Sequence, residues 1–445
     1  MTKVQKWLVA LLAVVAILAL GFSFNLFVNN KTKSKKQETV ATTSTVPAKK
    51  RANKKLEQAK LLAQHYNYDG AIKVLEDEDT KSADKLKTTF EKEKGQLVAW
   101  QDPEEISHVF VHSLIVDPQK AFNDKEQAQG YKDYMITITE FKRTIQQLYD
   151  NDYVLVTFED LVEENSDGKL QFKGVRLPEG KKPLIFSQDD VNYYEYMKGA
   201  GFADKLVVDK EGKVKNTYED NGQEKTGDYD MVPILDEFVE EHPDFSYHGS
   251  KGILALTGYN GALGYRTSKS EYGNNEKTNQ EIEKAKQVAN RLKDTGWTFA
   301  SHTWGHINMA ENGKEQIAKD TQRWKDEVAP IIGDTDVLIY PHGADISDFH
   351  PYDENPKYDY LKQQGFRIFC NVDASVPSWG QFNSNYYRNA RINLDGIRFK
   401  SELDGKNDVL EDFMNVKDVY DHKRDQYRTR IRDSLVLVFC TLLLG

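Results

Sequence analysis

The chain of 445 residues is too long for one ordinary domain of roughly 100 to 200 residues, but it suits one large barrel with appendages. Its 60 basic and 70 acidic residues give a net charge of -10, which argues against a nucleic-acid binder. Only two cysteines, Cys370 and Cys440, are present, and this excludes a disulfide scaffold or a cysteine-rich metal site. Any bound metal must therefore be held by histidine, aspartate or glutamate.

The N-terminus contains a long apolar run. Residues 7–28 carry no charge, and as a helix they are long enough to cross a bilayer core of about 30 Å. No small-residue cleavage site closes the run convincingly, and no cysteine follows it closely to accept a lipid. We therefore predict an uncleaved signal-anchor over residues 1–28, with a cleaved signal peptide as the alternative. Lysines flank both ends of the run, so the charge pattern alone does not fix its orientation.

Two further segments separate this run from the main domain. Residues 29–50 are rich in lysine, threonine and serine and have little to bury, which predicts a disordered linker. Residues 51–100 carry apolar positions at helical spacing, interrupted by the turn-like sequence at 67–70. This pattern predicts a helical hairpin or stalk that resembles a single tetratricopeptide helix pair. Such a hairpin can dock a protein partner, although its own sequence does not name one.

Residues 101–425 alternate short β-rich runs with amphipathic helices. The predicted strands cover residues 109–111, 153–157, 184–186, 253–256, 297–300, 337–340 and 367–370. The predicted helices cover residues 138–149, 231–241, 276–293, 315–332 and 357–364. Such alternation predicts an α/β fold whose parallel sheet closes into a (β/α) barrel. Residues 207–228 interrupt it as an inserted hairpin placed to overhang the site, and residues 426–445 form a C-terminal tail whose apolar stretch is too short to span a bilayer.

Residues that carry chemistry follow directly on four of the predicted strands. They are His112, the pair Asp189 and Asp190, the pair His302 and His306, and Pro341 with His342. In a (β/α) barrel these positions share the rim at the carboxyl ends of the strands, where active sites are built. We therefore expect a single functional site at this rim.

The pair His302 and His306 is the strongest single signal. On one helical turn an H-x-x-x-H spacing places both imidazoles on the same face, where they can bind one metal ion. The alternative is a loop in which one histidine caps and the other packs. Asp190, which taken alone could simply belong to a helix N-cap, would complete a set of two nitrogens and one oxygen. That set leaves positions open for water and suits a hydrolytic Zn²⁺ or a similar divalent ion.

Three segments resemble motifs of the polysaccharide deacetylases, the NodB homology domain or carbohydrate esterase family four. LIFSQDDVN resembles the first motif, SHTWGH the second and IYPHG the proline-containing third, and the resemblance spans roughly residues 106–398. It implies a distorted (β/α) barrel and hydrolytic removal of N-acetyl groups. It also implies that Asp189 is the catalytic base and that Asp190, His302 and His306 hold a divalent metal, with Zn²⁺ the expected ion.

The general acid departs from the usual family pattern. No leucine-histidine pair follows the third motif, where the family usually places this acid. Upstream, VFVHSLI resembles a strand of the permuted poly-N-acetylglucosamine deacetylases, in which the acid precedes the first motif. The helix-strand unit that follows, residues 136–161, is also similar to theirs. This resemblance assigns the role of general acid to His112.

The first and third motifs also carry substitutions. Gln188 stands where the first motif has phenylalanine, and His342 stands where the third has an aromatic residue. The arginine often found in the third motif is missing, and Arg391 is a candidate to orient Asp189 in its place. The turn after Pro341 is placed to offer a backbone N–H to a developing oxyanion.

Three classes of function fit these observations. We expect a membrane-tethered, extracellular enzyme that removes N-acetyl groups from an N-acetylglucosamine polymer, either cell-wall peptidoglycan or a secreted matrix glycan. A catalytically impaired glycan-binding relative at the cell surface is the second class, and a metallohydrolase acting on another amide or ester is the third. The expected partners are the polysaccharide and, through the N-terminal helix, the membrane, but no nucleic acid.

Overall fold

The structure is a computed structural model that describes residues 48–123 and 126–427. The chain divides into two compact units, Met1–Lys54 and Lys55–Gly445, and the second contains the barrel. The predicted signal-anchor, all but the last three residues of the predicted linker, and the tail from residue 428 onward lie outside the described residues. Within the described part of the chain, no helix combines the length and apolar character needed to cross a membrane.

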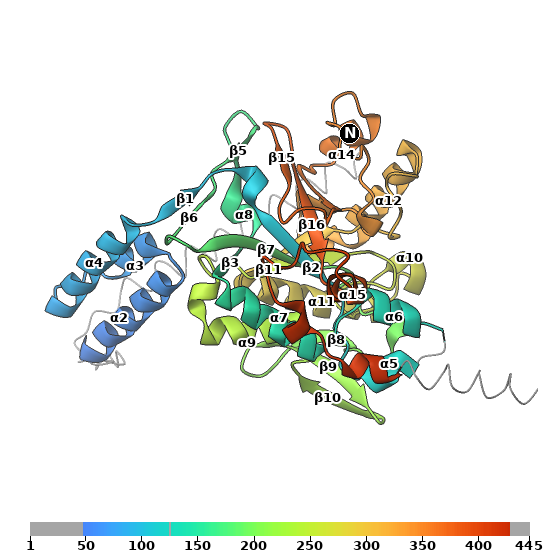
Figure 1. The fold of residues 1–445 in the computed structure, drawn as a ribbon, viewed down its shortest axis with the longest axis horizontal. Helices are drawn as coiled ribbons and strands as arrows, with labels where there is room; N and C mark the ends of the chain where they lie inside the picture. The colour runs from blue at the N-terminus through green and yellow to red at the C-terminus, as the bar shows by residue number, and fades with distance from the viewer. Residues whose placement is uncertain (1–47, 124–125, 428–445) are drawn as a thin grey trace, which may run out of the picture. The chain divides into compact units, whose positions relative to one another are not determined.

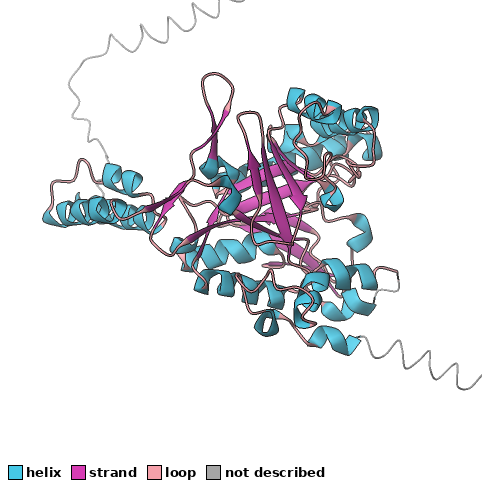
Figure 2. Ribbon diagram, turned by 45° about the horizontal axis from the view of Figure 1, so that its top comes forward, coloured by secondary structure: helices cyan, strands magenta, loops and turns pink. Residues whose placement is uncertain are grey.

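Seven parallel strands close into the predicted barrel, which Figure 2 shows as a central group of strands surrounded by helices. In ring order they are β2 (Ser107–Val111), β7 (Lys182–Gln188), β11 (Gly252–Leu256), β12 (Trp297–Ser301), β13 (Val337–Ile339), β14 (Ile368–Val372) and β16 (Tyr387–Asn393). They are buried almost throughout because helices and loops cover the outer face. The barrel is distorted, since β12 and β13 share only one paired position, Ser301 with Leu338.

The helices that connect the strands, together with two that follow the last strand, form the outer layer of the domain (Figure 1). They are α5 (Pro118–Asn123), α6 (Ala128–Tyr134), α7 (Ile138–Asp150), α8 (Phe158–Leu161), α9 (Met231–Glu241), α10 (Lys269–Tyr272), α11 (Glu276–Asp294), α12 (Lys314–Glu327), α13 (Ala329–Ile332), α14 (Pro356–Gln363), α15 (Gly396–Leu403) and α16 (Val416–Val419). The helix predicted over residues 315–332 is divided into α12 and α13. The division falls just before Pro330, which has no N–H to continue the helix and disfavours helical geometry in the preceding residue.

One predicted strand lies outside the ring, and one ring strand was not predicted. β3 (Tyr153–Val156) pairs with β7 outside the ring, and its Leu155 also forms an isolated bridge to Ser246. The seventh place in the ring belongs to β16, whose first residues also pair with the short antiparallel strand β15 (Gly380–Phe382). The sequence of β16, YRNARIN, has no apolar alternation, so it gives no strand signal. Its polar side chains are nevertheless buried, because they make polar contacts inside the domain.

The segment predicted as a helical hairpin contains three helices and a strand. They are α2 (Ala48–Gln64), α3 (Tyr68–Val74), α4 (Lys81–Lys94) and β1 (Val98–Trp100). Thr80 begins the additional helix by accepting a hydrogen bond from the N–H of Ala83. β1 pairs with β6 (Val175–Leu177), and the Tyr66 hydroxyl donates to the carbonyl of Asp244 at 2.7 Å. From Lys55 onward this segment therefore packs against the barrel domain.

The predicted inserted hairpin is a three-stranded antiparallel sheet. Its strands are β8 (Lys205–Val208), β9 (Val214–Asp220) and β10 (Gln223–Gly227). A separate two-stranded sheet is formed by β4 (Val162–Glu164) and β5 (Leu170–Phe172). The three-stranded insertion stands beside the loops that follow β7 and β11, since the Leu206 N–H donates to the Leu263 carbonyl at 3.1 Å. It is thus close to the rim at which the site residues were expected.

Candidate active site

The polar residues predicted from the sequence follow strands that run in the same direction around the barrel. His112 follows β2, Asp189 and Asp190 follow β7, His302 follows β12, and Pro341 begins the turn after β13. Because these strands are parallel, all of these residues lie at the carboxyl rim.

Asp190, His302 and His306 offer three ligand atoms that all lie within 4.8 Å of one another. Nδ1 of His302 lies 2.8 Å from the carbonyl of Ile339, so this nitrogen carries the proton and Nε2 is free to act as a ligand. Burial lowers the pKa of His302 to about 4, which keeps the ring neutral, as a metal ligand must be. Two nitrogens and a carboxylate are a donor set that a divalent metal can use.

The residues between the two histidines form a loop, so the predicted helical turn over residues 302–306 is wrong. Thr303 and His306 adopt left-handed backbone angles, with φ of 59° and 51°. Asp320 holds the loop in this shape by accepting from the backbone N–H of Trp304 at 2.6 Å. The two imidazole rings still converge, with centroids 4.9 Å apart.

Arg391 holds the side chain of Asp189 from within the barrel. Its Nη1 and Nη2 donate to the two carboxylate oxygens at 2.7 Å and 2.9 Å, and both residues are buried. Burial acts to raise the pKa of Asp189, but Arg391 and then His302 outweigh it and hold the pKa well below its usual range. Asp189 is therefore an ionised carboxylate held in a fixed orientation beside the metal donors.

A chain of buried polar groups continues behind Arg391. Ser187 Oγ lies 3.2 Å from Arg391 Nη1 and 2.8 Å from His108 Nε2. Nδ1 of His108 contacts the side-chain oxygen of Asn389 at 2.8 Å. Burial lowers the pKa of His108 to about 3, so this ring is neutral and bridges two neutral partners. The sequence analysis missed this chain because its members lie inside strands.

Replacing Arg391 by methionine is expected to lower the free energy of unfolding by about 3–5 kcal/mol, since it leaves the buried Asp189 carboxylate without a cation. Urea unfolding followed by circular dichroism measures the loss. The double variant Asp189→Asn with Arg391→Met should recover part of it, because no buried charge is then left unpaired. A single variant as stable as wild type would show that the pair does not matter for stability.

Tyr194 is a site residue that the sequence analysis missed. Its hydroxyl donates to Asp190 Oδ1 at 2.6 Å and lies 2.8 Å from Thr257 Oγ1. These bonds occupy one carboxylate oxygen of Asp190 and leave Oδ2 free, 3.9 Å from His306 Nε2. Burial acts to raise the pKa of Asp190, but His306 and then His302 outweigh it and lower this pKa, so the ligand is ionised.

Replacing Tyr194 by phenylalanine is expected to weaken metal affinity by roughly 10–100-fold, because hydrogen bonds to ligating side chains hold them in position. A competition titration of Zn²⁺ against a chromophoric chelator measures the affinity. Tyr196→Phe is the matched control, since it removes a hydroxyl from the adjacent ring that does not bond to Asp190. Equal affinities in the two variants would mean that the Tyr194 hydroxyl has no such role.

His112 lies near both carboxylates without being tied to the backbone. It is partly buried and packs edge-to-face on Phe110, with ring centroids 5.8 Å apart. It is close enough to Asp189 and Asp190 that its charge acts to lower the pKa of each. Within residues 48–123 and 126–427, no hydrogen-bond partner is found for its ring, so it is available to a ligand.

The two substituted motif positions have different surroundings. His342, at φ 60° in the turn Pro341–Gly343, packs its ring 4.5 Å from that of His306, and burial and then His306 lower the pKa of His342. Gln188 instead contacts Asp230, because its side-chain amide donates to both carboxylate oxygens of that residue at 2.9 Å and 3.0 Å. His342 thus borders the metal donors, whereas Gln188 supports the barrel.

A comparison with protein-family models agrees with the resemblance inferred from the motifs. The family model of the polysaccharide deacetylases matches residues 274–367, which confirms that resemblance and supports deacetylation in general. The matched segment contains His302, His306 and the turn at Pro341. No curated protein matches the chain. Among solved structures, the deacetylase PplD of Streptococcus pyogenes in complex with acetate matches at 13% identity and a TM-score of 0.37, covering 71% of this chain and 100% of that one.

Proposed function

We propose that this chain, which carries the polysaccharide deacetylase match over residues 274–367, is a metal-dependent hydrolase that removes N-acetyl groups from a polysaccharide containing N-acetylglucosamine. The observation that carries the proposal is the convergence of Asp190, His302 and His306 within 4.8 Å beside the separately held carboxylate of Asp189. Metal-assisted amide hydrolysis uses both parts: a set of metal ligands, and a carboxylate that is not one of them and can take a proton.

The donor atoms fit a divalent ion, of which Zn²⁺ suits two imidazoles and one carboxylate best. When bound, such an ion would polarise the acetamide carbonyl and lower the pKa of water from 15.7 towards about 7. His302 and Asp190 are already arranged for it, because Ile339 and Tyr194 occupy the atoms that face away from the site.

The remaining steps fall to side chains of this chain. Asp189, kept ionised by Arg391, accepts a proton from the attacking water. His112 donates a proton to the nitrogen of the leaving amine, which cannot depart as an anion. The turn at Pro341 and His342 lies beside His306 and offers its backbone to the developing oxyanion.

Acetate release from acetylated glucosamine oligomers, measured with and without a chelator, tests the proposal. We expect release that stops when metal is removed and returns with added Zn²⁺. Oligomer binding without any release would favour the catalytically impaired glycan-binding relative. Hydrolysis of other acetyl amides or esters, with glucosamine oligomers untouched, would favour a metallohydrolase of another class.

We further propose that the run at residues 7–28 anchors the chain in the cell membrane and that everything after it lies outside the cell. The run is apolar and uncharged, and a polymer of the wall or matrix is met only outside. Protease added to intact cells is therefore expected to cut within residues 29–50 and release the barrel domain. An immunoblot against the barrel measures the cut. Protection of residues 29–50 from the protease would indicate the opposite topology and would argue against an extracellular substrate.

A further inference from the structure

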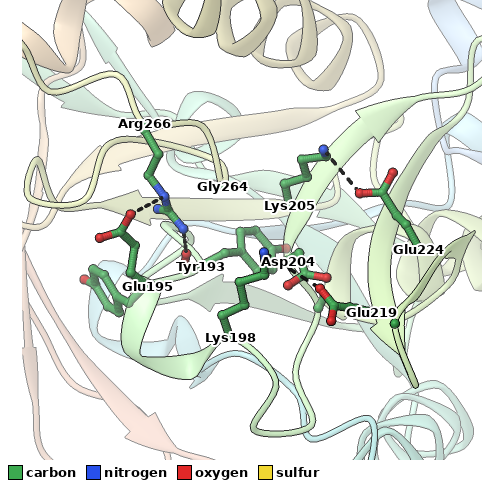
Figure 3. Close-up of a pocket in the computed structure, with 12 residues that line it drawn as sticks. Tyr193, Glu195, Lys198, Asp204, Lys205, Glu219, Glu224, Gly264 and Arg266 are labelled. Atoms are coloured by element: carbon green, nitrogen blue, oxygen red, sulfur yellow. Dashed lines mark hydrogen bonds and ion pairs between the residues drawn. The ribbon is translucent and has the colours of Figure 1, made fainter. Parts of the chain in front are cut away.

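A recess is formed partly by the inserted sheet, and Figure 3 shows the residues that line it. It has a volume of about 340 Å³ and is bounded by the loop after β7, the loop after β11 and the β9–β10 hairpin. Three ion pairs line it: Glu195 with Arg266 at 3.6 Å, Lys198 with Glu219 at 3.8 Å, and Lys205 with Glu224 at 3.5 Å. This size falls within the range of small-molecule pockets, roughly 300–1,000 Å³.

A stack of three tyrosines includes Tyr194, which also lines this recess. The ring of Tyr194 lies between those of Tyr196 and Tyr259, with centroid separations of 5.5 Å and 4.6 Å and interplanar angles of 14° and 5°. Tyr196, at the outer end, is 53% exposed. An exposed aromatic ring backed by two others is a rigid, flat apolar surface that a ligand can cover at little entropic cost.

Tyr194 joins the recess and the stack to the metal donors. It lines the recess, it is the middle ring of the stack, and its hydroxyl donates to Asp190 at 2.6 Å. A ligand that fills the recess is therefore one side chain away from a metal-ligating carboxylate.

The lining indicates the chemistry of the ligand. Charges of both signs line the recess: the carboxylates are Glu195, Asp204, Glu219 and Glu224, and the cations are Lys198, Lys205 and Arg266. Hydroxyl groups can donate to Glu195, Glu219 and Glu224 and accept from Lys198, Lys205 and Arg266. The apolar face of a pyranose ring can cover an aromatic surface, while its hydroxyls reach such charged groups. Both features together suit a neutral sugar.

We propose that the recess and the tyrosine stack form a subsite for a sugar unit that neighbours the reacting unit of the polymer. The identity of that polymer rests on the proposed function above. The subsite lies entirely outside the family match at residues 274–367, and Glu219 and Glu224 come from the inserted sheet. The insertion therefore selects oligomers over single sugars.

Two variants test the subsite, each with a matched control. The double variant E219Q/E224Q removes two of the charged acceptors, and Y196A removes the outer ring. E211Q changes an exposed glutamate on the β8–β9 turn of the same sheet, and Y134A removes a tyrosine that is 54% exposed and outside the stack. Calorimetry on the full chain gives the dissociation constant of the N-acetylglucosamine pentamer. Acetate release gives kcat and KM for the pentamer and for the monosaccharide.

Each test variant is expected to raise the dissociation constant and KM of the pentamer by about 10-fold, because E219Q/E224Q weakens hydrogen bonds to charged acceptors and Y196A removes an aromatic contact surface. The kcat values, monosaccharide kinetics and both controls should stay at wild-type levels. Unchanged pentamer binding in E219Q/E224Q and Y196A would overturn the subsite, as would a wild-type chain that binds no pentamer. Pentamer binding that weakens in the variants, in a wild type that releases no acetate, would support the subsite and refute the proposed function.

Discussion

Replacing His306 by alanine is expected to leave the purified protein without its metal, whereas the wild type should contain about one equivalent of Zn²⁺ or a similar divalent ion. The expectation follows from the three donor atoms within 4.8 Å, because the loss of one leaves Asp190 and His302 to hold the ion against water. Mass spectrometry of the metal content after dialysis measures the result. His342→Ala is the matched control, since its ring touches that of His306 but is not part of the donor set.

Two outcomes would contradict this assignment. Stoichiometric metal in a folded variant with alanine at Asp190, His302 and His306 together would place the metal site elsewhere in the chain. A folded wild type that takes up no metal would favour the glycan-binding interpretation instead. Circular dichroism of each variant separates these outcomes from simple unfolding.

The barrel could be predicted from the sequence because most of its strands are apolar runs buried on both faces. Six of the seven ring strands, β2, β7, β11, β12, β13 and β14, coincide with strands predicted from the sequence. β16 could not be predicted because its sequence is as polar as that of a loop. Its arginines are nevertheless buried, since Arg388 pairs with Asp345 and Arg391 pairs with Asp189. A charged side chain can be buried when it pairs with an opposite charge across the barrel. The partner is distant in the sequence, so a local sequence pattern does not reveal the pair.

The site could be predicted where its residues follow strands directly. That rule selects residues 112, 189, 190 and 302, and it would also have selected Thr257, which follows β11 and contacts Tyr194. Tyr194 itself lies in a loop, where neither strand nor helix periodicity gives a signal. The sequence predicts that the two histidines converge, but on a helical turn. In the structure they converge because the loop between them contains left-handed backbone positions and is held by the carboxylate of Asp320.

Replacing His112 by alanine is expected to lower the turnover of acetylated glucosamine oligomers by about 10²- to 10⁴-fold, the usual contribution of a general acid. The leaving amine must be protonated as the carbon–nitrogen bond breaks, and His112 lies close to the carboxylate of Asp189, which would take the proton from water. Its ring packs on Phe110 and, among the described residues, has no hydrogen-bond partner. A histidine that merely ends a buried strand would have its ring nitrogens bonded to the backbone.

The size of the loss alone does not identify a proton donor, so metal content and glycan affinity are measured beside kcat. Both should stay near wild type in His112→Ala, because this residue is not one of the three donors. Asp189→Asn should be similarly inactive and retain its metal, which separates both catalytic variants from His306→Ala. Wild-type turnover in a folded His112→Ala would remove the assignment of the acid. The proton would then have to come from another group at the rim, and His342, packed against His306, would be the next candidate.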